Sequence, residues 1–239
     1  MFSTLIFELH SGVATITLNR PEARNALNLQ MCEELRAAAL AAAADESVKV
    51  VFVRGNGPVF CAGADVKERA GMDIDQVRAR RMKGFAAYEA LEALPMPAVA
   101  AVHGAALGSG VEIAAACDFI VAAPDAVFGT PEAQRGTVGA TQRLPRVLGK
   151  RLAKDLMFTG RRLSAEEARN AGFVSRIHAN LDEELERIAK AIVQAPPDAT
   201  RLAKRCIDQG IELDPRGALE VELAALEQQL ASGKWMGKG

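Results

Sequence analysis

The sequence predicts an α/β fold, because short apolar strands alternate with segments of helical periodicity through most of the chain. Two of the strand–loop–helix junctions carry glycine-rich turns, one in VFCAGADVKE and one in VHGAALGSGVEI. With 239 residues and 49% hydrophobic content, the chain is long enough for one large domain with a helical region at its end. The composition therefore argues for a folded α/β protein and against disorder.

The charge balance and the cysteines exclude several functional classes. Lys and Arg number 29 against 30 Asp and Glu, so a formal net charge of −1 argues against binding to nucleic acids or anionic membranes. The 4 cysteines are scattered without CxxC pairs, which predicts neither a metal site nor a disulfide framework. No signal peptide is recognisable, and no apolar run reaches the ~20 residues of a membrane span. We therefore expect a soluble, cytoplasmic protein with reduced thiols.

The N-terminal part predicts a hairpin, a helix and a buried strand. Residues 4–9 and 13–18 alternate apolar and polar side chains, which is typical of an antiparallel hairpin. Asn28 can cap the alanine-rich helix over residues 29–44. Residues 48–53 are apolar nearly throughout, which indicates a strand that is buried on both faces.

A charged helix follows the first glycine-rich junction. Asp65 can cap a short helix, and residues 74–94 form an amphipathic helix that the PMP segment ends. Its basic side chains are Arg78, Arg80, Arg81 and Lys83. The simplest interpretation of this basic face is a solvated helix surface; contact with phosphates is the alternative.

The central stretch predicts a strand, a glycine turn and a helix. Residues 98–102 are apolar, and the turn after them opens a periodic segment that begins near Val111. Residues 119–122 and 126–128 are predicted as two further strands.

The remainder of the chain is predicted to be mainly helical. Residues 143–159 form one or two helices, residues 164–167 fit a capping box, and residues 173–177 form a last short strand. A helix over residues 181–194 leads to a Pro-Pro break.

The Pro-Pro break at Pro196 is the predicted boundary between a core, residues 1–195, and a C-terminal helical region, residues 196–239. The amphipathic helices predicted over residues 200–211 and 215–230 have apolar stripes that a small helical pair could not bury alone. We therefore expect them to pack on the core or on another subunit.

The second glycine junction has the local features of a reactive site. A helix start directs unpaired backbone N–H groups and the positive end of the helix dipole at whatever lies in front of it. Two acids follow, Glu112 and Glu132. Each also has an ordinary interpretation, because Ser109 to Glu112 fits a capping box and Thr130-Pro131-Glu132 fits a helix start.

Two other chemistries are excluded at this junction by its sequence. GSGVEI is not the G-x-G-x-x-G fingerprint of dinucleotide binding. Ser109 is not in a G-x-S-x-G nucleophile elbow, because Leu107 stands at the first glycine position.

Several blocks together resemble the crotonase superfamily of acyl-CoA enzymes, most closely the enoyl-CoA hydratases. They are NRPEARNALN, VFCAGADVKE, PAVAAVHGAALGSGVEIAAACDFIVAA, FGTPE, TQRLPRVLGK and FTGRRLSAEEARNAGFVSRI, in the family's order over roughly residues 5–180. The resemblance implies a crotonase (ClpP-like) spiral core of repeated ββα units. It also implies a C-terminal helical trimerisation region, and hence a homotrimer or a dimer of trimers.

The resemblance also implies a set of site residues. The thioester carbonyl would be held by the backbone amides of Ala64 and Ser109, where the helix dipole adds to the hydrogen bonds. Glu112 and Glu132 would hold the water and move the protons, with Gly139 as an amide that supports the water. The expected coenzyme A contacts are Arg24, Ala26, Ala62, Asp65, Val66 and Lys67. Coenzyme A is then part of the acyl-CoA thioester substrate, and no separate cofactor is expected.

The implied activity is reversible syn hydration of a 2-enoyl-CoA, since two acids favour a hydratase over related isomerases. A Δ3,Δ2-enoyl-CoA isomerase, another enolate-forming reaction and a non-catalytic acyl-CoA or RNA-binding protein are the alternatives. The chain departs from the family's pattern in three places. Ser109 replaces the usual glycine, the loop GTVGATQRLPR is about three residues shorter than usual, and the ending QQLASGKWMGKG is atypical.

Overall fold

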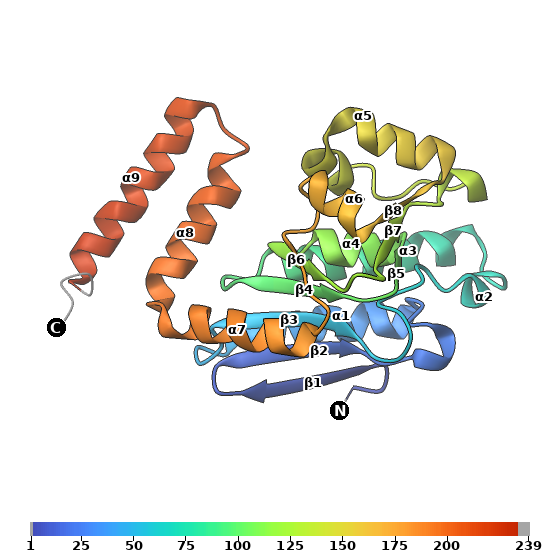
Figure 1. Ribbon diagram of the computed structural model, residues 1–239, viewed down its shortest axis with the longest axis horizontal. Helices are drawn as coiled ribbons and strands as arrows, with labels where there is room; N and C mark the ends of the chain where they lie inside the picture. Colours follow the sequence, from blue (N-terminus) through green and yellow to red (C-terminus); the bar gives the residue numbers. More distant parts are fainter. Residues whose placement is uncertain (1, 234–239) are drawn as a thin grey trace.

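The computed structural model describes residues 2–233 and shows two sheets surrounded by helices (Figure 1). The larger sheet has six strands, in the order β1 (Leu5–His10), β2 (Val13–Leu18), β3 (Val50–Gly55), β4 (Ala98–Val102), β6 (Phe119–Ala122) and β9 (Arg176–Ile177). The β1–β2 pair is the predicted antiparallel hairpin, and the other pairs are parallel. The smaller sheet contains β5 (Ala105–Leu107), β7 (Val127–Gly129) and β8 (Arg162–Ser164).

Successive turns of the chain place one strand in each sheet. After β4 the chain enters the smaller sheet as β5, and after β6 it enters as β7, parallel to β5. The turn before them follows the same path, because Cys61, after β3, forms a parallel bridge with Ala106 of β5. The chain therefore winds as a spiral, and the connections of neighbouring turns lie side by side.

Helices lie on both faces of the larger sheet, and the last two lie beside the core (Figure 1). They are α1 (Leu29–Ala44), α2 (Val66–Arg69), α3 (Ile74–Glu92), α4 (Ser109–Ala115), α5 (Arg143–Thr159), α6 (Ala165–Asn170), α7 (Leu181–Gln194), α8 (Pro197–Gly210) and α9 (Pro215–Ser232), with short 3-10 turns η1 (Pro21–Ala23) and η2 (Ala133–Arg135). Helix α5 bends at Gly149, whose φ of 72° lies outside the helical region, so the segment forms two helical pieces.

The core explains why the predicted central strand is apolar throughout. Val51 and Val53 of β3 belong to the main core on one face of the sheet. Val50 and Phe52 point to the other face, where α7 covers them with Leu185 and other side chains. Both faces are buried, as expected for parallel strands between helical layers.

Three predicted caps are confirmed. Asn28 accepts a hydrogen bond of 2.9 Å from Met31 N at the start of α1. Asp65 accepts from Lys67 N and Glu68 N at the start of α2. Ser164 forms both halves of a capping box at α6. Each cap satisfies amides that have no partner inside the helix.

The prediction of a solvated basic face on α3 is wrong for two of its members. Arg80 is only 5% exposed, pairs with Glu68 at 2.7 Å and also donates to Leu27 O. Arg81 is half-buried and donates to Thr137 Oγ1 at 2.7 Å. The reason is that α3 packs against α1 and α4, so this part of its surface faces protein.

The structure also corrects some element boundaries. Strands β5 and β8, with three residues each, were not predicted, and the strand expected over residues 173–177 is reduced to Arg176–Ile177. In these segments, pairing with distant strands creates the strand where the local pattern is too short to indicate it.

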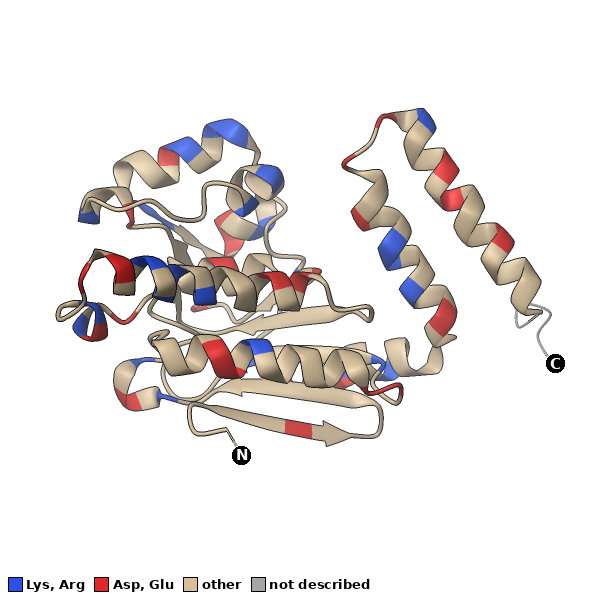
Figure 2. Ribbon diagram, turned by 180° about the vertical axis from the view of Figure 1, so that it is seen from behind, with Lys and Arg blue, Asp and Glu red and all other residues tan. Residues whose placement is uncertain are grey.

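Helices α8 and α9 form an antiparallel hairpin beside the core in both views (Figures 1 and 2). The predicted apolar stripe of α9 stays largely exposed, with Leu219 at 53% and Leu223 at 49%. The division of the chain at residues 195/196 stays a prediction, and the atypical ending after Gly233 lies outside the described residues. Among residues 2–233, no helix combines the length and apolar character that a membrane crossing requires.

Candidate active site

The glycine turn before α4 differs from the predicted capping box. The helix begins at Ser109, its N-cap is Gly108 with φ 50° and ψ −110°, and no side chain caps it. The Ser109 hydroxyl instead lies near the Tyr88 hydroxyl of α3, where it opposes the rise that burial causes in the pKa of that group. Glu112 therefore does not serve as the partner of a cap, and its carboxylate is available for other contacts.

Two backbone amides meet at this turn. Leu27 N donates to Gly63 O and Asp65 N donates to Leu27 O, so in this parallel bridge the N–H of Ala64 points away from Leu27. On that other side lies the start of α4, because a Cβ added to Gly63 would be 2.9 Å from Leu107 O and 3.9 Å from Ser109 N. Within residues 2–233, neither the Ala64 N–H nor the Ser109 N–H has a hydrogen-bond acceptor.

The two acids line the same cavity as these amides. Ala64, Ser109, Glu112, Glu132 and Gly139 all face a cavity of about 70 Å³, which Arg81, Phe85 and Tyr88 of α3 close on one side. The structure thus brings together the five residues that the family resemblance implied for this site.

Glu112 is 8% exposed on α4, whereas Glu132 is half-buried at the start of η2. The Glu132 side chain fits between two glycines. A Cβ added to Gly108 would clash with Glu132 Oε1, and a Cβ added to Gly139 would be 3.0 Å from Glu132 Cγ. Glu132 Oε2 is buried and has no hydrogen-bond partner among the described residues. This buried oxygen is an unsatisfied hydrogen-bond acceptor, which a water or a substrate group could satisfy.

Burial raises the pKa of both carboxyl groups. For Glu112, the negative charge of Glu132 raises the pKa further, while Arg143, the Ala140 N–H and Arg81 oppose the increase. For Glu132, its own backbone N–H and the charges of Arg135 and Arg81 oppose the effect of burial on the pKa. One neutral and one ionised carboxyl group is the state that such a buried pair favours.

Three residues around the pair were not predicted as part of the site. Arg81 was noted only as part of a basic surface, and Arg143 only as part of the block TQRLPRVLGK. Arg143 pairs with Glu92 at 2.7 Å and lies over the Tyr88 ring, 5.7 Å from its centroid. Tyr88, the only tyrosine of the chain, could have been singled out as a buried hydroxyl on a charged helix.

The residues expected to hold coenzyme A lie on two adjacent segments beside Ala64. Ala62 N donates to Arg24 O at 3.0 Å, and Arg20 links Ala26 O to the carboxylate of Asp65. A smaller cavity of about 40 Å³, lined by Ala62, Ala64, Val66 and Glu132, adjoins this rim.

The side chains along this rim differ in their availability. Val66 is 47% exposed, and Arg24 and Lys67 are also exposed, so they are free to meet a ligand. The Asp65 carboxylate is already engaged by Arg20 and by the amides of α2, so its role is to support the rim.

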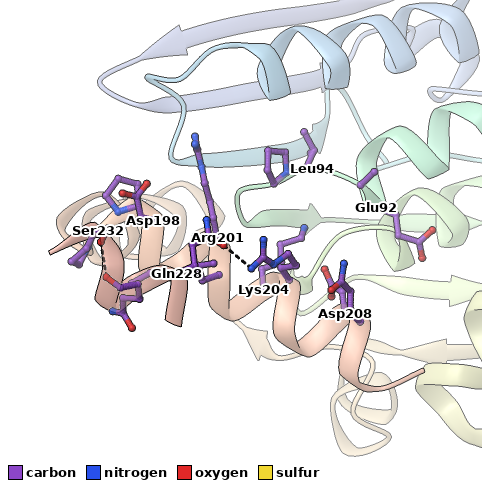
Figure 3. Close-up of a pocket in the computed structure, with 17 residues that line it drawn as sticks. Glu92, Leu94, Asp198, Arg201, Lys204, Asp208, Gln228 and Ser232 are labelled. Atoms are coloured by element: carbon purple, nitrogen blue, oxygen red, sulfur yellow. Dashed lines mark hydrogen bonds between the residues drawn. The ribbon is translucent and has the colours of Figure 1, made fainter. Parts of the chain in front are cut away.

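A much larger cavity, of about 970 Å³, lies between α8–α9 and the connection from α3 to β4 (Figure 3). Lys204 in its wall pairs with Asp118 at 2.9 Å, and burial raises the pKa of Asp208. None of the residues predicted for the site lines this cavity. Among the described residues, no group of three or more His, Cys, Asp or Glu side chains is arranged to hold a metal ion.

Comparisons with known proteins agree with this arrangement. The family model described as enoyl-CoA hydratase/isomerase matches residues 8–237. The enoyl-CoA hydratase domain-containing protein 2 of Homo sapiens is 42% identical over 223 residues, which covers 88% of this chain and 76% of that protein.

Solved structures are similar over nearly the whole chain. The crystal structure of an enoyl-CoA hydratase from Bacillus anthracis superposes with a TM-score of 0.92 at 38% identity, covering 99% of this chain and 92% of that one. An enoyl-CoA hydratase from Mycobacterium smegmatis gives a TM-score of 0.91 at 33% identity, with 95% and 91% coverage. The predicted crotonase spiral is therefore confirmed, and the chain belongs to the enoyl-CoA hydratase/isomerase family of the crotonase superfamily.

Proposed function

We propose that the protein catalyses the reversible syn hydration of a 2-enoyl-CoA thioester to a 3-hydroxyacyl-CoA. The observation that carries the proposal is the convergence of two unpaired backbone amides and two buried carboxyl groups on one cavity. Membership of the family supports the same class of substrate.

In the proposed reaction, the thioester oxygen accepts hydrogen bonds from Ala64 N–H and Ser109 N–H. These donors stabilise the negative charge that grows on the oxygen as water attacks the β-carbon and an enolate forms. Ser109 is the first residue of α4, so the positive end of the helix dipole adds to the stabilisation.

The two carboxyl groups handle the water and the protons. An ionised carboxylate accepts a proton from the water as its oxygen bonds to the β-carbon, and a neutral carboxyl group delivers a proton to the α-carbon. Glu132 Oε2, which lacks a partner, is placed to bind the water, and Gly139 lies against the same side chain. Burial raises the pKa of both groups, which favours the protonated form that the proton donor needs.

The coenzyme A portion of the substrate would lie along the rim beside Ala64. Backbone groups of Arg24, Ala26 and Ala62 and the exposed Val66 would contact it, and Lys67 would add positive charge near the nucleotide. Coenzyme A enters as part of the substrate, so the proposal requires no separate cofactor.

The direct test is loss of the conjugated thioester absorbance of crotonyl-CoA and longer 2-enoyl-CoAs. Glu112→Gln and Glu132→Gln should each lower kcat by on the order of 10²-fold or more, because each removes a general acid–base group. Glu89→Gln, at an exposed position of α3, is the control and should match the wild type. Absence of turnover at every chain length, or full activity in both site variants, would refute hydration.

A Δ3,Δ2-enoyl-CoA isomerase is the second candidate, and the shortened loop after Glu132 favours it. An isomerase moves one proton between two carbons and needs no bound water, so one carboxylate can suffice. Turnover of a 3-enoyl-CoA that survives Glu112→Gln would support this activity over hydration.

An RNA-binding role has less support, because the basic residues of α3 are engaged within the protein. Arg78 pairs with Asp75, Arg80 with Glu68 and Lys83 with Glu33. Salt-sensitive retention of RNA in a filter-binding assay would be needed to revive it.

A further inference from the structure

The loop that follows Glu132 is attached to a distant helix by one side chain. Arg81 of α3 donates through Nη2 to Thr137 Oγ1 at 2.7 Å and to the backbone carbonyl of Val138. The loop, residues 136–140, is the first part of GTVGATQRLPR, the segment that the family resemblance indicates to be shorter than usual. Val138 is 65% exposed, so packing of its side chain contributes little to holding the loop.

The same loop contacts both carboxyl groups of the proposed site. Gly139 packs against the Glu132 side chain, and the backbone N–H of Ala140 is near enough to the Glu112 carboxylate to oppose the rise that burial causes in its pKa. Ala140 has a φ of 55°, a left-handed conformation that costs free energy for a residue with a side chain. Such a conformation persists only where surrounding contacts enforce it.

Ala140 itself is buried in the main core, but few other hydrogen bonds fix the path of this loop. Thr137 N donates to Glu132 O, which is a local turn, and Leu144 N donates to Ala140 O at the start of α5. Within the described residues, the two Arg81 hydrogen bonds join residues 136–140 to a separate element, α3, and the Ala140 N–H faces the Glu112 carboxylate. Arg81 therefore supplies the attachment on the side away from Glu112.

We infer that Arg81 is a positioning residue for the proposed reaction, in which its guanidinium fastens residues 137 and 138 so that Gly139 and Ala140 hold the two glutamates facing one cavity. The inference rests on the proposed function for its catalytic consequence. The attachment of the loop itself can be measured without any substrate.

The positive charge of Arg81 also acts on the two carboxyl groups of the site. The charged or titratable groups that face the carboxyl pair are Arg81 and Tyr88 from α3, Arg143 from α5 and Arg135 from η2. Arg81 is the cation that lowers the pKa of both Glu112 and Glu132, while Arg143 acts on Glu112 and Arg135 on Glu132. Loss of Arg81 should therefore make both carboxyl groups harder to ionise.

The first experiment measures the loop by hydrogen–deuterium exchange of peptides that cover residues 136–140. Arg81→Met removes both hydrogen bonds and should speed exchange by about tenfold or more, as expected for the loss of charge-assisted hydrogen bonds. Arg78→Met, three residues earlier on α3 and paired with the exposed Asp75, is the matched control and should leave the exchange unchanged. Equal exchange in Arg81→Met and the wild type would overturn the inference, whatever the activity.

The second experiment separates geometry from charge by steady-state kinetics with crotonyl-CoA as a function of pH. Arg81→Met should lower kcat by about tenfold or more with a smaller change in KM, and should move the acidic limb of kcat/KM to higher pH. Arg81→Lys keeps the positive charge but loses the guanidinium hydrogen bonds to Thr137 and Val138. The acidic limb of its kcat/KM profile should therefore stay near the wild-type position while kcat remains lowered.

The kinetic outcomes also distinguish this inference from the proposed function. An unchanged kcat and pH profile in Arg81→Met would overturn the role of Arg81 in an active enzyme. A wild-type protein that turns over no enoyl-CoA would overturn the proposed hydration, while the exchange experiment would still decide whether Arg81 holds the loop.

Discussion

At the scale of single residues, Glu112 shows how a local pattern can be overruled. Its spacing from Ser109 fits a capping box, yet the helix starts at Ser109 itself, one residue earlier than a cap at Ser109 would require. The Ser109 hydroxyl lies instead near the hydroxyl of Tyr88, 21 residues earlier in the chain on α3, and opposes the rise that burial causes in its pKa. Glu112 is left buried beside a second carboxyl group, which raises the free energy of its ionised form.

Glu112→Gln should therefore stabilise the protein at neutral and higher pH. The pKa of Glu112 in the folded state is raised above its ordinary value of 4.5, mainly by burial, so the folded state retains this proton where the unfolded state has lost it. Wild-type stability should then fall as the pH rises from the unfolded to the folded pKa.

Thermal unfolding from pH 4 to pH 8 tests this expectation. The Tm of Glu112→Gln should exceed that of the wild type at pH 8, and the difference should shrink as the pH falls and Glu112 becomes neutral. Glu89→Gln, which alters an exposed carboxylate, should show no such trend. A Glu112→Gln variant that is less stable than the wild type at pH 8 would contradict the sign.

Ser109→Ala should destabilise the protein by about 1–3 kcal/mol, because it removes the polar group that lies near the buried Tyr88 hydroxyl. Tyr88→Phe combined with Ser109→Ala removes both groups and should cost less than the sum of the two single changes. Urea denaturation of the four proteins of this cycle measures the coupling. Strict additivity would mean that the two hydroxyl groups do not interact.

At the scale of elements, α3 connects the core to the proposed site. Arg80 points toward α1 and α2, where it meets Leu27 O and Glu68. Arg81, the next residue, points toward the loop after Glu132. Phe85 and Tyr88, one and two turns further, close the cavity in front of the carboxyl pair. A shift of this helix would therefore disturb packing and site together.

Arg80→Met should destabilise the fold by about 3–5 kcal/mol, because the loss of one partner leaves the largely buried Glu68 carboxylate without its guanidinium. Lys83→Met is the control on the same helix. The Lys83–Glu33 pair is about half exposed at both ends, so its loss should change stability by no more than about 0.5 kcal/mol. Equal urea midpoints for the two variants would show that the buried Arg80–Glu68 pair stabilises the protein no more than the exposed Lys83–Glu33 pair does.

At the scale of the whole molecule, the α8–α9 hairpin lies beside the core and leaves large apolar side chains exposed. Leu219, Leu223, Leu226 and Leu230 of α9 are between 41% and 53% exposed. Ile207 and Ile211 of the α8 end are 67% and 81% exposed. A contiguous apolar surface of this kind is typical of an interface between subunits.

We expect the protein to assemble as a homotrimer or a dimer of trimers through this region. Sedimentation velocity should give a mass of about three or six times the 25.4 kDa chain. Leu223→Glu combined with Leu226→Glu should lower that mass, since a charge at each exposed leucine opposes burial. Glu227→Gln on the same helix is the control and should leave the mass unchanged, whereas a monomeric wild type would refute the assembly.

Much of the fold follows from patterns that are local in the sequence. The β1–β2 hairpin depends on alternation over a few residues, and Asn28, Asp65 and Ser164 cap helices by hydrogen bonds that span two or three residues. Such contacts form between neighbours in the chain, so their signal is present in the local order of residue types. The motifs of the family similarly identified the positions that now line the cavity.

The contacts that arrange the site are of a different kind. Arg81 reaches a loop 56 residues away, and β8 exists because it pairs with β7 more than 30 residues earlier. The meeting of Ser109 with Tyr88 and the burial of Arg80 likewise depend on where α3 packs. Local propensity carries no information on such distant partners, because the free energy that selects them comes from burial and hydrogen bonding across the whole folded chain.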